Sequence, residues 1–175
     1  MTISSQKITT IGLLIALSVI LTRLASIRIA IAGVEGIRIG LGRLPIILGG
    51  VLFGPIVGGI VGGLADLLGY FINPMGAYMP HFTLTSALGG IIPGVIINLK
   101  KEEFNYLNLT LAITIGQILT SLLLTPYFLH LLFGLPWLVI LPPRLIAEPI
   151  QILIYTYTIN LILKRDVLKI KSSSI

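Results

Sequence analysis

The sequence contains no cysteine and little charge of either sign. Without cysteine the chain has no disulfide, no thiolate ligand for a metal and no cysteine nucleophile. Charged residues make up 10% of the 175 residues, whereas a soluble domain of this length would carry about a quarter. Hydrophobic residues make up 55%, and the mean hydropathy is +1.05. This composition excludes an ordinary soluble domain and predicts a polytopic membrane protein.

Several motifs of well-known enzyme classes are also absent. The chain has no GxxxxGK phosphate-binding loop, no HExxH and no GxSxG elbow. Its two histidines, His81 and His130, lie far apart in the sequence, and a zinc site needs more ligands than they supply. No nucleophile and base stand at a suggestive spacing. We therefore expect a binding protein that is not an enzyme and that uses no metal and no cofactor.

Apolar runs predict six transmembrane helices in a single domain over residues 1–175, an all-α membrane protein folded as one compact bundle. The expected spans are Ile8–Ser26, Leu44–Phe53, Pro55–Tyr70, Thr83–Leu99, Leu107–Leu131 and Pro143–Leu163. The second span is too short to cross alone, since about 20 apolar residues are needed. It meets the third at a tight turn, Gly54-Pro55. The first run lacks a small-residue cleavage site, so we expect a retained helix.

Basic residues predict the orientation. With six spans, one side of the membrane receives Lys7, Lys100, Lys101, Lys164, Arg165, Lys169 and Lys171. The positive-inside rule makes that side cytoplasmic, so we expect a cell-membrane protein with both termini in the cytoplasm. The other basic residues are all arginines and lie at or toward the outer face: Arg23, Arg28, Arg38, Arg43 and Arg144. Because arginine makes forked hydrogen bonds to carboxylates, this division favours an anionic ligand outside.

A polar and aromatic segment interrupts the apolar runs between the third and fourth spans. Its candidate ligand-binding residues are Asp66, Tyr70, Asn73, Tyr78, Phe82, Thr83 and Thr85. An interfacial aromatic belt is the alternative for aromatic residues near the outer face. It suits Tyr70 and Tyr78 less well, because they lie beside Asn73, Pro74 and Gly76. A carboxylate at the depth of Asp66 needs a partner, which would be a ligand or a neighbouring helix.

The sixth span carries a polar stripe. Arg144, Glu148, Gln151 and Tyr155 follow the spacing i, i+4, i+7 and i+11, which places them on one helix face. A charge near the bilayer centre costs roughly 2.5–3.5 kcal/mol on insertion scales, so the stripe must face the interior or a cavity. Either Arg144 and Glu148 pair with each other and hold helices together, or the stripe faces a ligand. The fifth span repeats this spacing with Thr110, Thr114, Gln117 and Ser121, for which interhelical hydrogen bonding is the favoured explanation.

Small residues predict two close helix contacts. In the third span Gly58 and Gly62 form a GxxxG pair, which lets another helix approach. In the first span Gly12 and Ala16 form a small face of the same kind. The helix that packs there would belong either to this chain or to a partner protein, and the spacing does not choose between them.

Four segments spread over almost the whole chain resemble a known family. They are Arg38–Pro55, Asp66–Tyr70, Pro74–Thr85 and Pro143–Pro149. The sequence is similar to the substrate-binding S components of energy-coupling factor (ECF) vitamin transporters, and most of all to the folate-specific type. Its most specific part is the combination of Arg-Ile-Gly, Tyr-x-Pro-x-Phe-Thr-Leu-Thr and Pro-Arg-Leu-Ile.

The resemblance implies a six-helix subunit that captures one vitamin near the outer face. Such a subunit associates with a transmembrane coupling protein and two cytoplasmic ATPases, which drive import. Gly12 and Ala16 match the Ala-xxx-Ala face with which the family docks on the coupling protein, with glycine for the first alanine. Pro80-His81-Phe82-Thr83 stands where the family has Pro-Gly-Phe-Thr, so His81 is a further candidate contact.

The chemical groups of folate fit the polar and aromatic residues that the sequence provides. Its flat pterin ring would stack between aromatic residues drawn from Tyr70, Tyr78 and Phe82. The polar edge of the pterin would be bound by Asp66 or Glu148, with Gln151 and Asn73. The two carboxylates of its glutamate tail would be neutralised by Arg28 and Arg38.

Three other functions stay open at this point. The first is an S component for another vitamin, such as riboflavin, thiamine or a related pterin, although the outer arginines argue against cationic thiamine. The second is a small intramembrane enzyme that uses Asp66, Glu148 and His81. The third is a channel or facilitator that works without ATPases.

Overall fold

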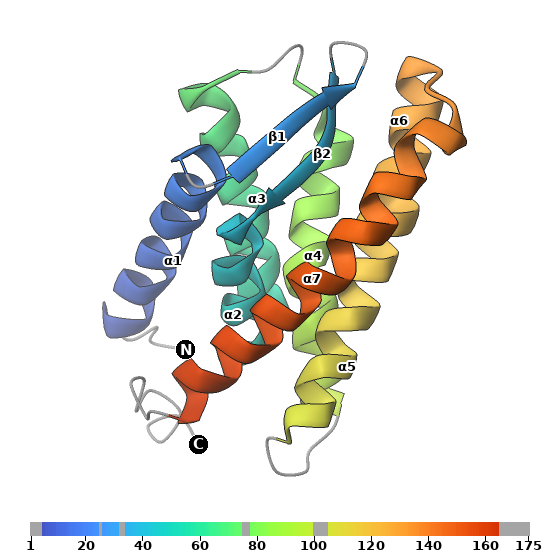
Figure 1. The fold of residues 1–175 in the computed structure, drawn as a ribbon. Coiled ribbons are helices and arrows are strands. Elements are labelled where there is room, and N and C mark those ends of the chain that lie inside the picture. The colour runs from blue at the N-terminus through green and yellow to red at the C-terminus, as the bar shows by residue number, and fades with distance from the viewer. Residues whose placement is uncertain (1–4, 25, 32–33, 75–77, 100–104, 165–175) are drawn as a thin grey trace.

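A computed structural model describes residues 5–24, 26–31, 34–74, 78–99 and 105–164. The helices are α1 (Ser5–Leu24), α2 (Leu44–Phe53), α3 (Pro55–Ile72), α4 (Pro80–Leu99), α5 (Tyr106–Gln117), α6 (Thr125–Phe133) and α7 (Trp137–Lys164). The strands are β1 (Ser26–Ile31) and β2 (Val34–Gly40). A 3₁₀ turn, η1 (Leu41–Arg43), precedes α2, and a π-helical segment, η2 (Ile118–Leu124), joins α5 to α6. The helices stand side by side as one bundle (Figure 1).

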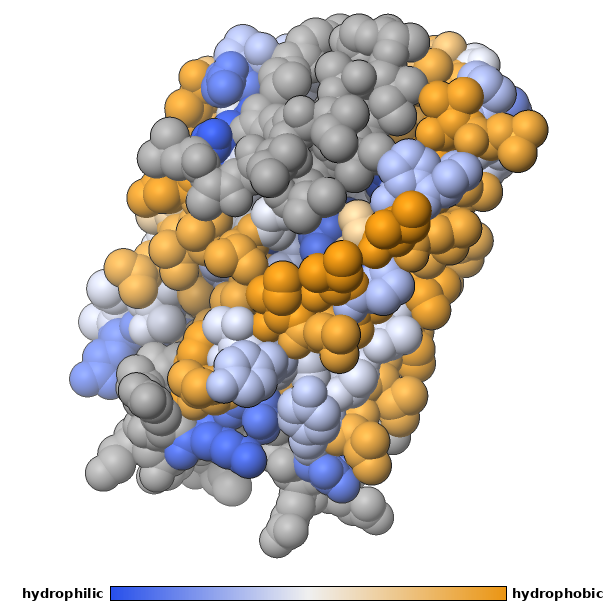
Figure 2. Space-filling view, viewed as in Figure 1, coloured by the Kyte–Doolittle hydropathy of each residue, from blue (hydrophilic) through white to orange (hydrophobic). Residues whose placement is uncertain are grey.

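Five stretches of helix are long and apolar enough to cross a membrane. They are Ser5–Arg23, Pro55–Ile72, Pro80–Leu99, Tyr106–Phe133 and Trp137–Lys164. Leu41–Phe53 is shorter, as expected for the second span. Large apolar side chains cover the outside of the bundle, with Leu138 86% and Ile56 78% exposed, and Figure 2 shows apolar residues across the middle of the visible face. The predicted helical membrane bundle is confirmed at this level.

Helices α1, α4, α5 and α7 begin earlier than the sequence predicted, at Ser5, Pro80, Tyr106 and Trp137. Helix α4 begins at Pro80 and not at Thr83, because proline at the first helical position has its φ already set and lacks an N–H that would be unpaired anyway. Helix α7 begins at Trp137, so the predicted start at Pro143 was wrong. Prolines are tolerated inside membrane helices because neighbouring groups satisfy the carbonyls that they leave free.

An antiparallel pair of strands connects α1 to η1, and the sequence analysis did not anticipate it. The pairing runs from Ser26 opposite Gly40 to Ile31 opposite Val34, with an irregularity between Ile29 and Ala30. The all-α expectation therefore holds for the bundle but not for this connection. The strands lie against the upper part of the bundle in Figure 1, where β2 leads down into η1 and α2.

Glycines bring α2, α3 and α4 into backbone contact. A Cβ added at Gly58 would lie 2.6 Å from the Cα of Gly50 and 2.7 Å from the carbonyl carbon of Gly90. A Cβ added at Gly62 would lie 2.8 Å from the carbonyl carbon of Ser86. The close contact predicted for the Gly58–Gly62 pair is thus confirmed, and its partner is α4.

We expect Gly90→Ala to lower the thermal midpoint of the detergent-purified protein. The added methyl group would overlap the backbone of Gly58, and overpacking of this kind costs about 1–3 kcal/mol. The matched control is the neighbouring Gly89→Ala, whose new Cβ would have no neighbour within 4 Å. Equal midpoints for the two variants, measured by a thermal shift assay, would contradict backbone contact at Gly90.

The turn between α2 and α3 depends on a glycine conformation. Gly54 has φ 92° and ψ 172°, a region that side chains rarely allow, and Pro55 begins α3 directly after it. The tight turn predicted at Gly54-Pro55 is therefore confirmed. It lets the short helix α2 return immediately as α3, so that both pack against α4.

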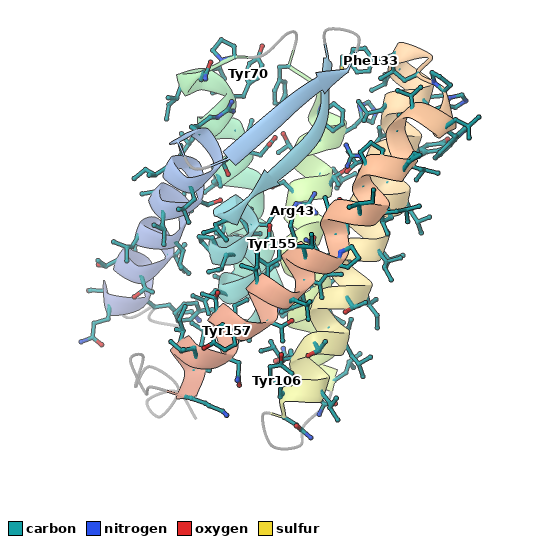
Figure 3. The ribbon with its side chains drawn as sticks, in the orientation of Figure 1. Arg43, Tyr70, Tyr106, Phe133, Tyr155 and Tyr157 are labelled. Carbon is teal, nitrogen blue, oxygen red and sulfur yellow. The ribbon has the colours of Figure 1, made fainter. Side chains whose placement is uncertain are left out.

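The two ends of the bundle carry different kinds of side chain. The start of α1 and the end of α7 lie at the same end, with Lys7 and Lys164, and hydrophilic residues gather there (Figure 2). Tyr70 and Phe133 lie at the opposite end, near the strands (Figure 3). The remaining basic residues counted for the predicted cytoplasmic side lie outside the described residues: Lys100, Lys101, Arg165, Lys169 and Lys171.

Candidate functional site

The polar stripe of α7 faces the interior of the bundle. Arg144 is 7% exposed, Glu148 5%, Gln151 6% and Tyr155 1%. The i, i+4, i+7, i+11 spacing therefore predicted correctly which face of α7 is buried. Groups of this polarity are buried only with partners, and those partners come from other segments of the chain.

Arg144 and Glu148 meet at the same residue of η2. Nη1 of Arg144 donates to the backbone oxygen of Ser121 at 3.2 Å, and the hydroxyl of Ser121 donates to Oε1 of Glu148. The second carboxylate oxygen of Glu148, Oε2, is buried and has no hydrogen-bond partner among the described residues. Since a buried oxygen without a donor costs free energy, this atom is suited to accept a hydrogen bond from a ligand.

The segment that presents Ser121 is π-helical over Ile118–Leu124. Two threonine hydroxyls bond backbone carbonyls of the same helix: Thr120 donates to Gly116, and Thr125 donates to Thr120, each at 2.7 Å. Such bonds compete with the regular backbone ladder. π-Helical turns are rare and occur frequently at functional sites.

Arg43 reaches the same segment from the start of α2. Its Nη1 donates to Oε1 of Gln117 at 2.7 Å and to Oγ1 of Thr120 at 3.3 Å. Figure 3 shows Arg43 at about mid-height of the bundle, close to the label of Tyr155. Neither Arg43 nor Gln117 was among the predicted site residues. The sequence did indicate Gln117, because Gln117 and Ser121 belong to the polar stripe of the fifth span. We attributed that stripe to hydrogen bonding between helices.

Tyr155 connects α7 to the end of the strand pair. Its hydroxyl lies 2.6 Å from the backbone oxygen of Gly40 and 2.7 Å from Oε1 of Gln151, and both oxygens are acceptors. Gly40 is the last residue of β2 and directly precedes η1. Tyr155 therefore links the end of β2 to the polar stripe of α7.

A second polar group lies at the upper end of α3 and α4. Oγ1 of Thr83 donates to Oδ2 of Asp66 at 2.7 Å, so the threonine oxygen is left to accept from the hydroxyl of Tyr78 at 2.9 Å. The ring of Tyr70 lies 5.2 Å from that of Tyr78, tilted by 57°. Asp66, Tyr70, Tyr78 and Thr83, which the sequence predicted as site residues, are therefore together.

The other predicted residues of that segment lie elsewhere. Thr85 is buried and donates to the backbone oxygen of His81 in its own helix at 2.8 Å. Asn73 has an exposed side chain, and its backbone oxygen accepts from Arg23 at 2.8 Å. Phe82 packs against an apolar cluster made of Leu129, Leu135 and Ile140. The contacts described for these three residues are therefore with other parts of the chain than the Asp66 group.

The three residues named in the enzyme interpretation each contact a different neighbour. Asp66 and Glu148 are bound by hydroxyls of different helices, Thr83 and Ser121. The exposed ring of His81 lies 4.9 Å from that of Phe128.

The remaining predicted residues lie on the outside of α1 and in the strands. Gly12 and Ala16 are exposed, and a Cβ added at Gly12 would have no neighbour within 4 Å. The described residues therefore do not use this face for internal packing. The Cα atoms of Arg28 and Arg38 are direct partners in the β1–β2 register.

The fold and its interior polar groups define a small multi-pass membrane protein. Residues 2–165 match the family described as the ECF-type riboflavin transporter, S component. The folate transporter FolT of Clostridium novyi (strain NT) is 36% identical over 146 residues, which are 83% of this chain and 81% of FolT. A crystal structure of FolT bound with folic acid has a TM-score of 0.74 and 30% identity, covering 89% of this chain and 90% of that one. The chain belongs to the S components of ECF-type transporters.

This membership confirms the family resemblance found in the sequence. It also decides against the enzyme interpretation, because the matched proteins are transporter components.

Proposed function

We propose that this chain is the folate-binding S component of an ECF-type vitamin importer. The observation that carries the proposal is its similarity, along almost its whole length, to FolT and to the structure of FolT bound with folic acid. The chain would capture folate at the outer end of the bundle. Import would then need the separate coupling protein and the two ATPases that the family implies.

Riboflavin is the second candidate ligand, because the matching family carries that vitamin in its description. The charges of the chain favour folate. The Cα atoms of Arg28 and Arg38 are partners in the strand register. Because arginine makes forked hydrogen bonds to carboxylates, two arginines in this connection suit the two carboxylates of folate, whereas riboflavin has no charge to offer.

The polar group around Asp66 and the polar group around Glu148 would then both contact the pterin. The rings of Tyr70 and Tyr78 would pack against its flat face, since aromatic rings prefer offset or tilted contacts of this kind. The carboxylates of Asp66 and Glu148 would accept hydrogen bonds from its amino-bearing edge. The hydroxyl of Thr83 would keep Asp66 in position.

The proposed orientation has six spans and both termini in the cytoplasm. Lys7 and Lys164 lie at the end of the bundle where α1 begins and α7 ends, and positive charge favours the cytoplasmic side. The strands and Tyr70 would then lie at the outer face. The exposed small face at Gly12 and Ala16 would receive a helix of the coupling protein, because small residues let helix backbones approach closely.

We expect calorimetric titration of the purified protein to give a folate dissociation constant below about 1 μM, which corresponds to roughly −8 kcal/mol. Riboflavin in the same titration is expected to bind at least tenfold more weakly. The reverse order of affinities would replace folate with riboflavin as the ligand. An absence of binding to either vitamin would overturn the proposal.

A further inference from the structure

The amide of Gln117 is held in one orientation by Arg43. Gln117 is 2% exposed, and the atom that Arg43 contacts must be the amide oxygen, because a guanidinium has donors and no acceptor. The amide nitrogen, Nε2, therefore points the other way. It is buried and has no hydrogen-bond partner among the described residues. A buried donor without a partner is unfavourable unless something binds it.

Glu148, which is bonded to Ser121 of the same fifth span, presents the opposite polarity. The hydroxyl of Ser121 holds Oε1, while Oε2 is buried and lacks a partner within the described part of the chain. Nη1 of Arg43 donates to both Gln117 and Thr120, and Thr120 directly precedes Ser121, which holds Glu148. The free donor of Gln117 and the free acceptor of Glu148 are thus connected through one short stretch of the fifth span.

We infer that Gln117 and Glu148 form a specificity pair, in which Gln117 donates to the ligand and Glu148 accepts from it. The inference rests on the proposed folate-binding function. The pterin edge of folate carries a 4-oxo acceptor beside an N3–H and a 2-amino donor, which matches this pair. Arg43 is a positioning residue, since it fixes which end of the Gln117 amide faces the ligand.

The test compares folate with aminopterin, in which an amino group replaces the 4-oxo group. The wild-type protein is expected to bind folate at least tenfold more tightly than aminopterin. Gln117→Glu keeps an oxygen for Arg43 but replaces the donor with a second oxygen acceptor. The ratio of the two affinities should therefore fall at least tenfold in this variant, and Arg43→Met should lower it too, because the amide is free to rotate.

Thr110→Val is the matched control from the same polar stripe. The Thr110 hydroxyl bonds the backbone of Tyr106 in its own helix, so the ratio should equal that of the wild type. Because both ligands are titrated into the same preparation, the ratio does not depend on the fraction of folded protein. A Gln117→Glu protein that binds folate with an unchanged ratio would overturn the specificity pair. A wild-type protein that binds no folate would instead overturn the proposed function.

Discussion

Gly12→Trp and Ala16→Trp are expected to reduce folate uptake by more than tenfold while leaving the affinity for folate unchanged. Both residues are exposed on α1, and an added side chain at Gly12 would meet no atom of the described chain. The buried face of α1 is a different one, with Leu14 4% and Val19 8% exposed. Bulk at positions 12 and 16 would therefore keep a partner helix away without disturbing the bundle.

The measurement pairs uptake of labelled folate by cells that contain the whole transporter with titration of the purified subunit. Leu153→Trp is the matched control, because it adds similar bulk at a 63% exposed position of α7. Uptake should survive in that variant. A parallel loss of uptake and binding in Gly12→Trp would mean that the face serves the fold of the subunit itself.

Hydropathy was sufficient to predict the framework of the fold. The short span at Leu44–Phe53 and the Gly54-Pro55 turn follow from length and from backbone chemistry, and both are present in the structure. The strands at Ser26–Ile31 and Val34–Gly40 were missed, although isoleucine at alternate positions is typical of strands. The apolar spans on either side dominate a search for hydrophobic runs, so this short alternation was not weighed.

The grouping of polar residues around Asp66 was predicted in part, and the start of α4 explains the difference. His81 and Phe82 were expected in the loop before the fourth span, and Thr83 was expected to begin that span. They form the first turns of a helix, and successive helical side chains point in directions about 100° apart. Thr83 therefore faces Asp66, while Phe82 and Thr85 make contacts of their own.

Arg43 shows what spacing along one helix cannot reveal. It lies far from Gln117 and Thr120 in the sequence, and it contacts them because the strand pair and η1 set the start of α2 against the fifth span. A stripe on a single helix is periodic and can be found from sequence. A contact between segments so far apart depends on packing, and the π-helical turn at Ile118–Leu124 further changes the phase of the stripe.

The double variant Arg28→Ala with Arg38→Ala is expected to weaken folate binding by about 10²–10⁴-fold. The register places these two residues opposite each other, and hydrogen bonds to charged groups contribute about 1.5–3 kcal/mol each. The same change to lysine keeps both charges and should lose much less affinity. Calorimetric titration of the three proteins with folate gives the comparison directly.

The control for this prediction compares folate with pteroate, a ligand that lacks the tail. Pteroate has the pterin and the benzoate of folate but lacks the glutamate with its two carboxylates. If Arg28 and Arg38 bind that tail, pteroate should bind the wild-type protein weakly, and the double alanine variant should lose less than tenfold further. Removal of either partner of an interaction makes removal of the other nearly neutral, which is the logic of a double-mutant cycle. Equal losses of folate and pteroate in the variant would show that the arginines support the strands and do not bind the tail.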